Sequence, residues 1–187
     1  MDVPDRSIQL MRYVALLRAV NLGAVRKMPM AELRSLLADL GHTDVATYLQ
    51  SGNAVFSSNR DDRAELTREL EDTMASHFGF EVPTILRSVV EVGEVVDGCP
   101  YRAEADNDPT RVHAVFIEPM PPDAVWEAVR SIDHSPEELT VGAGVVYMHT
   151  PDGMQRSRLS QTVERATRDV VATTRNWRTV VNLAGMI

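Results

Sequence analysis

The residues best suited to bind a ligand lie at the tip of one predicted hairpin, TYLQSGNAVF, at residues 47–56. Here β-forming residues flank Gln50, Ser51, Gly52 and Asn53. Gly and Asn tolerate positive φ, so the chain can reverse direction at this point without steric cost. Side-chain amides, a hydroxyl and exposed backbone N–H groups would then gather at the tip. The pattern predicts either a binding edge or a well-made turn.

A second group of polar residues follows the first apolar run of the chain and contains Asn21, Arg26 and Lys27. Amides, hydroxyls and cations of this kind bind anions, as they do in many phosphate sites. The alternative is that Asn and Ser side chains satisfy the backbone of their own turns while the cations are solvated. The spacing alone leaves both interpretations open.

The C-terminal part of the chain is basic inside an acidic protein. The formal net charge is −8, from 19 Lys and Arg against 27 Asp and Glu. The arginines of this segment are Arg156, Arg158, Arg165, Arg168, Arg175 and Arg178. Thr174 and Asn176, at the predicted start of the last helix, could present backbone N–H groups and an Arg to an anion. Alternatively, Thr174 caps the helix, Trp177 packs in the core and the arginines pair with acids.

Composition excludes several classes of protein. The negative charge argues against a general nucleic-acid binder, and no apolar run is long enough to span a bilayer. Residues 1–10 lack the basic and apolar regions of a signal peptide. The single cysteine, Cys99, suits a reducing compartment and lies in a setting typical of a buried or idle thiol. We therefore predict a cytoplasmic protein.

No catalytic constellation is visible. The five histidines show no metal-ligand spacing, and the chain contains no P-loop, GxSxG or GxGxxG motif. No general base can be nominated. We predict no catalytic residue, no metal and no cofactor, and the sequence leaves open whether the protein is an enzyme.

The order of apolar elements predicts an α+β protein. The expected elements of the first half are a strand at 13–20, a helix at 30–40, a hairpin at 45–57, a helix from Asp61 or Asp62 to Phe78, and a strand at 80–86. This β-α-β-β-α-β order is that of the ferredoxin-like unit. A short helix at 89–96 and a polar, proline-interrupted stretch follow.

The second half repeats this order. The expected elements are a strand at 111–118, a helix after Pro121 and Pro122, a hairpin around 142–144, a helix at 158–167, a β-branched run at 170–173, and a last helix. We therefore predict two tandem ferredoxin-like (βαββαβ) units with antiparallel sheets, plus a C-terminal helix. The expected domains are residues 1–87, a linker with a short helix at 88–110, and residues 111–187.

Three motifs spread along the chain resemble those of the bacterial domain-of-unknown-function family 1697. They are ALLRAVNLG with RKMPM (15–30), TYLQSGNAVF (47–56), and SRLS with ATTRNWRTVVNL (157–183). Ala19 and Ala24 stand where the family usually has glycine, which makes the first loop stiffer, and Arg158 stands where lysine is commoner.

The resemblance implies two ferredoxin-like halves with no assigned activity. The family's recurrent polar positions correspond to Arg18, Asn21, Lys27, Gln50, Ser51, Gly52, Asn53, Arg158, Thr174, Arg175 and Asn176. The resemblance assigns no catalytic role to any of them. We predict that they are ligand-binding residues.

The leading hypothesis is a protein that binds a small anionic ligand, phosphorylated or nucleotide-like, between the loops that carry the motifs. One alternative is RNA or single-stranded nucleic-acid binding through an RRM-like sheet face, with Tyr13 and Phe56 as the stacking platform. Against that alternative stand the net charge and the missing basic-aromatic signature. Another is a protein-interaction or dimerisation module, and self-association is left open.

Overall fold

The structure of the protein is a computed structural model that describes residues 10–23 and 25–186. The N-terminal stretch 1–9 and Ala24, which the sequence comparison above singles out, lie outside the described residues. The elements are, in order, β1 (Met11–Leu17), α1 (Met30–Asp39), β2 (Thr43–Thr47), β3 (Asn53–Ser58), α2 (Arg63–Phe78), β4 (Thr84–Ser88), α3 (Val89–Asp97), α4 (Arg102–Asn107), β5 (Val112–Glu118), α5 (Asp123–Arg130), β6 (Glu138–Gly142), β7 (Val145–His149), the 3₁₀ turn η1 (Met154–Arg156), α6 (Arg158–Ala166), β8 (Val171–Asn176) and α7 (Trp177–Ala184).

The first sheet has the strand order β2-β3-β1-β4, and all its pairs are antiparallel. The apolar run of β1 occupies a central position, as its near-continuous hydrophobicity predicts. Tyr13 pairs with Phe56 of β3 on one side and with Ser88 of β4 on the other. Helices α1 and α2 cover the sheet face that carries these two aromatic side chains.

The second sheet has the order β6-β7-β5-β8 and is also antiparallel throughout. Helices α5 and α6 pack on one of its faces through Trp126, Val129, Leu159 and Val163. The protein is therefore an α+β protein with two four-stranded antiparallel sheets, and this part of the predicted fold is confirmed.

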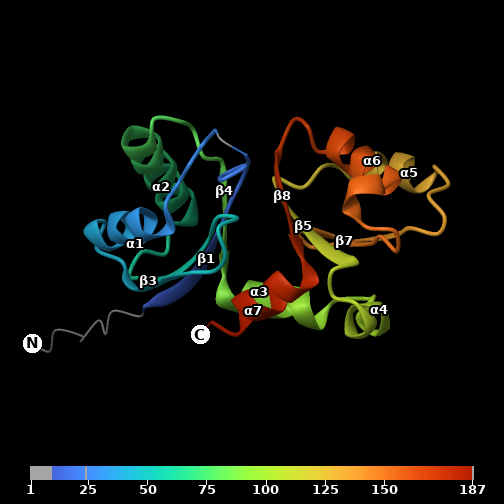
Figure 1. The fold of residues 1–187 in the computed structure, drawn as a ribbon, viewed down its shortest axis with the longest axis horizontal. Helices are drawn as coiled ribbons and strands as arrows, with labels where there is room; N and C mark the ends of the chain where they lie inside the picture. The colour runs from blue at the N-terminus through green and yellow to red at the C-terminus, as the bar shows by residue number, and fades with distance from the viewer. Residues whose placement is uncertain (1–9, 24, 187) are drawn as a thin grey trace, which may run out of the picture.

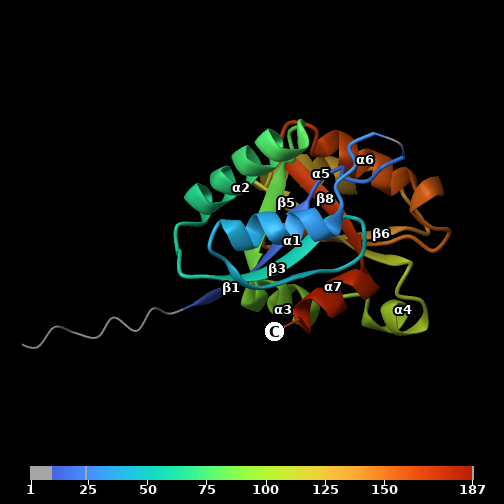
Figure 2. The ribbon, with the colours of Figure 1, turned by 60° about the vertical axis from the view of Figure 1, so that its left-hand side comes forward.

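The two sheets face each other across a shared interior (Figure 1). Helices α1 and α2 lie outside the first sheet, and α5 and α6 lie outside the second. Figure 2 shows α3 and α7 together along one edge of the interior. The side chains buried between the sheets include Val14 and Ile85 from the first and Phe116 and Tyr147 from the second, with Trp177 from α7. Alternate residues of the central strands β1 and β5 thus pack in two different cores, as the period of two requires.

Residues 88–110 contribute to this interior, although their polar composition predicts a linker. Helix α3 has a full capping box, in which Ser88 and Glu91 satisfy each other's backbone N–H groups, and it buries Val92 and Val95. Cys99 and Tyr101 follow it into the core. Cys99 is buried, as expected, and burial raises the pKa of its thiol. Charged residues on the exposed face of this segment dominate its composition, so composition alone does not reveal the apolar residues on its buried face.

Helix ends agree with several predictions and correct one. Asp62 caps α2 by accepting a hydrogen bond from Glu65 N, and Gly79 ends that helix in the left-handed conformation. The last helix is different. Thr174 was expected to cap it, but the strand β8 continues through this residue, and Asn176 caps α7 by accepting from Thr179 N at 3.0 Å. Asn, two residues later, is the stronger N-cap residue, and the strand continues to Asn176.

Candidate functional site

The loop after β1 is organised by the side chain of Asn21. Its amide nitrogen donates to Met28 O at 2.9 Å and to Gln50 O at 2.7 Å, while its amide oxygen accepts from Met28 N at 2.8 Å. Asn21 has a φ of 55°, and Ala19 has a φ of 56° at the position where the family usually has glycine. Left-handed backbone is costly for alanine. The Asn21 contacts hold this loop in that conformation and join it to the tip of the β2–β3 hairpin.

The hairpin tip packs closely against the end of β1 through Gly52. This glycine has a φ of 79°, and a Cβ atom added to it would lie 2.4 Å from Val20 Cγ2 and 2.9 Å from Leu17 Cβ. Its carbonyl also accepts a hydrogen bond from Leu17 N at 2.9 Å. Only glycine fits both the conformation and the close approach. The glycine of the hairpin motif is therefore explained by packing against β1.

Asn53, the last polar residue of the tip, points into the protein and is fully buried. Its amide nitrogen donates to Tyr48 O at 2.9 Å and to Ser51 Oγ at 3.1 Å. Its amide oxygen accepts from Nε of Arg175, which lies 122 residues further along the chain. The hairpin motif of the first half and the β8 motif of the second half thus meet at this bond.

Arg175, in the second half of the molecule, forms hydrogen bonds to several residues of the first half. One terminal nitrogen, Nη1, donates to Thr173 Oγ1 at 2.7 Å and to Thr174 O at 2.9 Å. The other, Nη2, donates to Leu17 O at 2.9 Å, to Gly52 O at 3.1 Å and, more weakly, to Ser51 O at 3.4 Å. Every N–H direction of the guanidinium is therefore used within the protein.

All the partners of Arg175 are neutral oxygens. Among the residues described by the structure, no carboxylate forms an ion pair with it, and its side chain is 7% exposed. Burial lowers the pKa of Arg175 to about 10, which still leaves it charged at neutral pH. The junction of the three motifs therefore carries a buried positive charge with no negative partner within residues 10–23 and 25–186.

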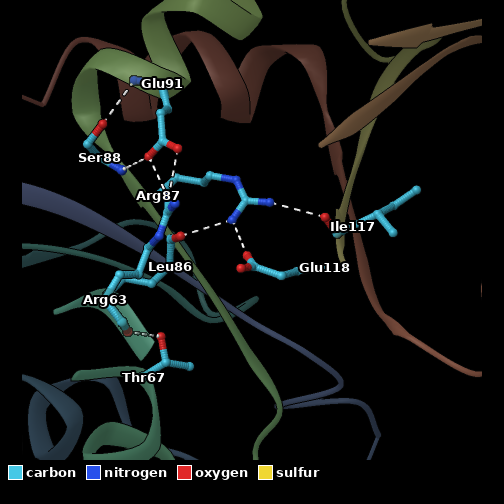
Figure 3. A network of polar contacts seen from close by, with 8 residues as sticks. All are labelled: Arg63, Thr67, Leu86, Arg87, Ser88, Glu91, Ile117 and Glu118. Carbon is cyan, nitrogen blue, oxygen red and sulfur yellow. Dashed lines mark hydrogen bonds and ion pairs between the residues drawn. The ribbon is translucent and has the colours of Figure 1, made fainter. Parts of the chain in front are cut away.

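A second arginine, Arg87, also forms hydrogen bonds between the two halves, but it has an acidic partner. Figure 3 shows Arg87 of β4 donating to Leu86 O, to Ile117 O at 3.1 Å and to the carboxylate of Glu118. Arg63, in the same view, pairs with both oxygens of Glu91. These cations have acidic partners, whereas Arg175 has none in the part of the chain that the structure describes.

A hollow of about 180 Å³ lies beside this junction. Three polar side chains line it whose terminal atoms have no hydrogen-bond partner among the described residues: Arg18 from the segment after β1, Ser160 from α6, and Thr174 from β8. Glu164 and Thr167 also line it, and Thr167 donates its hydroxyl hydrogen to Val163 O at 2.9 Å. Within residues 10–23 and 25–186, the Arg18 guanidinium forms no hydrogen bond and no ion pair.

The hollow combines residues from two of the three motifs, the first and the third. Arg18 comes from ALLRAVNLG, Ser160 from SRLS and Thr174 from ATTRNW. Alternation along β8 separates the roles of neighbouring residues, because Thr174 faces the hollow while Arg175 faces the hairpin tip. Arg175 therefore supports the site from behind.

The structure separates the sequence-predicted site residues into three groups. Asn21, Gly52, Asn53, Arg175 and Asn176 are used in internal contacts that hold loops and helix ends. Arg18 and Thr174 line the hollow. The remaining four, Lys27, Gln50, Ser51 and Arg158, have exposed side chains and do not line it.

Sequence reasoning missed Ser160, Glu164 and Thr167 as members of the site. They stand at positions i, i+4 and i+7 of one helical face, which is the spacing that places side chains in a single stripe. A polar stripe on a helix whose other face is apolar was the available signal. It becomes informative only once α6 is known to lie against β8.

The aromatic platform required for RRM-like nucleic-acid binding is not on the surface. Tyr13 is 2% exposed and Phe56 is fully buried, and both lie under α1 and α2. Stacking of bases needs an open aromatic face. The prediction of this platform was wrong, because both faces of the first sheet are covered.

Two further structural findings concern the part of the chain that is described. No group of three or more His, Cys, Asp or Glu side chains in residues 10–23 and 25–186 is arranged to hold a metal ion. Over the same residues, no helix has the length and apolar character needed to cross a membrane.

Known proteins resemble this chain at the levels of both family and structure. A model of the family described as protein of unknown function (DUF1697) matches residues 10–147, which confirms the resemblance found in the motifs. The solved structure of a conserved bacterial protein from Streptococcus pneumoniae is similar, with a TM-score of 0.76 and 28% sequence identity. That likeness covers 95% of this chain and 99% of the other. No protein with a curated description matches the chain.

Proposed function

We propose that this protein, which belongs to the DUF1697 family of proteins of unknown function, binds a small anionic ligand in the hollow formed by Arg18, Ser160 and Thr174. The observation that carries the proposal is the convergence of two motifs, from the two halves of the chain, on one hollow, together with an Arg18 guanidinium that has no partner among the described residues. A free Arg and two hydroxyls are the groups that bind phosphate or carboxylate oxygens.

The local charge favours an anion. Arg175 forms a hydrogen bond to Leu17 O, directly before Arg18 in the chain, and its charge has no acidic partner among the described residues. Because it is buried, this charge is little screened by solvent and adds to the positive potential at the hollow. Glu164 is the one carboxylate among the lining residues.

The size of the hollow limits what it can hold. About 180 Å³ accommodates one anionic group and little more, so the rest of a larger ligand would lie outside. The proposed ligand is therefore a small metabolite, or a nucleotide-like molecule that inserts a single phosphate. Glu164 would accept a hydrogen bond from a hydroxyl or amine next to the anionic group.

A thermal-shift screen tests this proposal. The probes are inorganic phosphate, pyrophosphate, nucleoside monophosphates and small dicarboxylates. A ligand at about 100 times its Kd should raise Tm by roughly 5–10 °C. Arg18→Ala should abolish the shift and Arg18→Lys should retain part of it.

The matched control is Arg168→Ala, which removes the same charge from an exposed side chain. It should leave the shift unchanged. Absence of any shift across the panel, or an equal loss in both alanine variants, would count against the proposal.

We also propose that each half is a ferredoxin-like unit with boundaries near residues 87 and 111. The strand order β4-β1-β3-β2 of the first half and the equivalent order of the second support this assignment. Residues 88–110 would then be a packed connection and not a free linker. A cytoplasmic location remains a prediction of the sequence, and self-association stays open.

A further inference from the structure

A second hollow, of about 400 Å³, lies on another side of α6. It is lined by His134 from the loop after α5 and by Arg158, Gln161 and Arg165 from α6. The residues of α6 that line the first hollow are different ones. The two hollows are therefore separate, and this one contains Arg158, a motif position that the first hollow leaves without a role.

The imidazole of His134 lacks a hydrogen-bond partner within the described part of the chain. Both of its ring nitrogens are shielded from solvent, and neither has a partner among the residues that the structure describes. A buried polar atom without a partner costs free energy, and in native proteins such atoms usually mark a function, a water or an ion. Rotation of the ring toward the adjoining hollow would give it a ligand oxygen as partner.

The loop that carries His134 is fixed against the start of α6. Glu137 Oε2 accepts a hydrogen bond from Leu159 N at 3.0 Å. Asp133 Oδ1 accepts from Ser135 N at 2.9 Å, which tightens the turn on which His134 lies. These contacts hold the imidazole beside the arginines of α6 without using their guanidinium groups.

The charge of the hollow is positive. Arg158 makes no side-chain hydrogen bond within the described part of the chain, and Arg165 donates through Nη2 to Thr162 Oγ1 at 3.2 Å, which leaves its other donors available. Asp133 also lines the hollow, but one of its oxygens is occupied by Ser135 N. Two guanidiniums against one partly engaged carboxylate favour a doubly charged anion over a carboxylate.

We propose that this hollow is a second anion site that takes the dianionic phosphate group of a phosphomonoester through Arg158, Arg165 and His134. Arg158 and Arg165 would hold phosphate oxygens through their planar donor groups. His134 would supply the third contact, and Gln161 would bind the hydroxyls of the attached group. The inference is independent of the first hollow, because the two sites share no lining residue.

Calorimetric titration with inorganic phosphate and with pyrophosphate tests this site. All titrated proteins carry Arg18→Ala, so that the first hollow, which is proposed to take the same anions, does not contribute. The test variant is the double substitution Arg158→Gln, Arg165→Gln. The matched control is Arg156→Gln, Arg168→Gln, which removes the same charge from exposed arginines at the two ends of α6. We expect the test variant to raise Kd at least about tenfold and the control to leave it nearly unchanged.

His134→Leu separates binding from stability. It removes both ring nitrogens while keeping an apolar body of similar bulk, so it should weaken phosphate binding without lowering Tm. Loss of binding in Arg18→Ala alone would support the first hollow and overturn this second site. Equal Kd values for the Arg18→Ala protein with and without the test substitutions would also overturn it, as would no heat of binding at millimolar phosphate or pyrophosphate.

Discussion

Replacement of Arg175 by methionine tests the structural role assigned to the motif junction. Methionine has a similar length and can remain buried, but it has no donors. The substitution removes the hydrogen bonds that Arg175 donates to Asn53 Oδ1 and Leu17 O, which join the two halves. It also removes the bond to Thr174 O within β8. Gly52 O keeps one donor, because it also accepts from Leu17 N.

The magnitude follows from two opposed effects. Each buried acceptor left without a partner costs about 1–3 kcal/mol, which gives roughly 3–9 kcal/mol for three acceptors. Removing a buried charge relieves a desolvation penalty of several kcal/mol, which offsets part of that loss. We therefore expect the free energy of unfolding to fall by about 2–4 kcal/mol.

Urea denaturation followed by circular dichroism measures this change. The control is Arg178→Met, which removes an exposed arginine three residues away and should cost less than about 0.5 kcal/mol. The m-value should stay constant, since the surface exposed on unfolding does not change. A loss below about 1 kcal/mol for Arg175→Met would show that the neutral acceptors do not depend on it, and the reasoning would be refuted.

Two further predictions concern other parts of the fold. Gly52→Ala places a Cβ atom against Val20 and Leu17 at a positive φ, so calorimetry should show a lower Tm and a loss of about 2–4 kcal/mol; an unchanged Tm would contradict the packing account. Burial lowers the pKa of His113 to about 4, below its unfolded value near 6.5, so the unfolded chain binds the proton more readily. Stability should therefore be complete above pH 6.5 and fall by about 3 kcal/mol toward pH 4, and His113→Gln should flatten this dependence in urea titrations at several pH values.

Much of the architecture follows from local signals in the sequence. The apolar run of β1, the Asp62 cap and Gly79 end of α2, and the glycine-centred hairpin at Gly52 are local features with a direct physical cause. The order of elements in each half was predictable for the same reason. The position of residues 97–110 was not, because the side chains that enter the core, such as Tyr101, are few among many charges.

The sequence pointed to some of the residues of the candidate site but not to their structural roles. Asn53 is a polar residue next to a turn and Arg175 is a charged residue near the end of a strand. Both features favour exposure, yet each side chain is buried and forms a hydrogen bond with the other, 122 residues away. Such burial depends on tertiary contacts that no local pattern encodes. The alternation of β8 decides that Thr174 faces the hollow while Arg175 does not, and this required the strand to extend through both residues.

A crystal structure of the protein with bound pyrophosphate tests the central claim most directly. We predict electron density for one phosphate group within hydrogen-bonding distance of the Arg18 guanidinium and of the Ser160 and Thr174 hydroxyls, with Arg175 unmoved behind it. An empty hollow in a crystal saturated with this anion, or an Arg18 side chain turned into solvent, would contradict the claim.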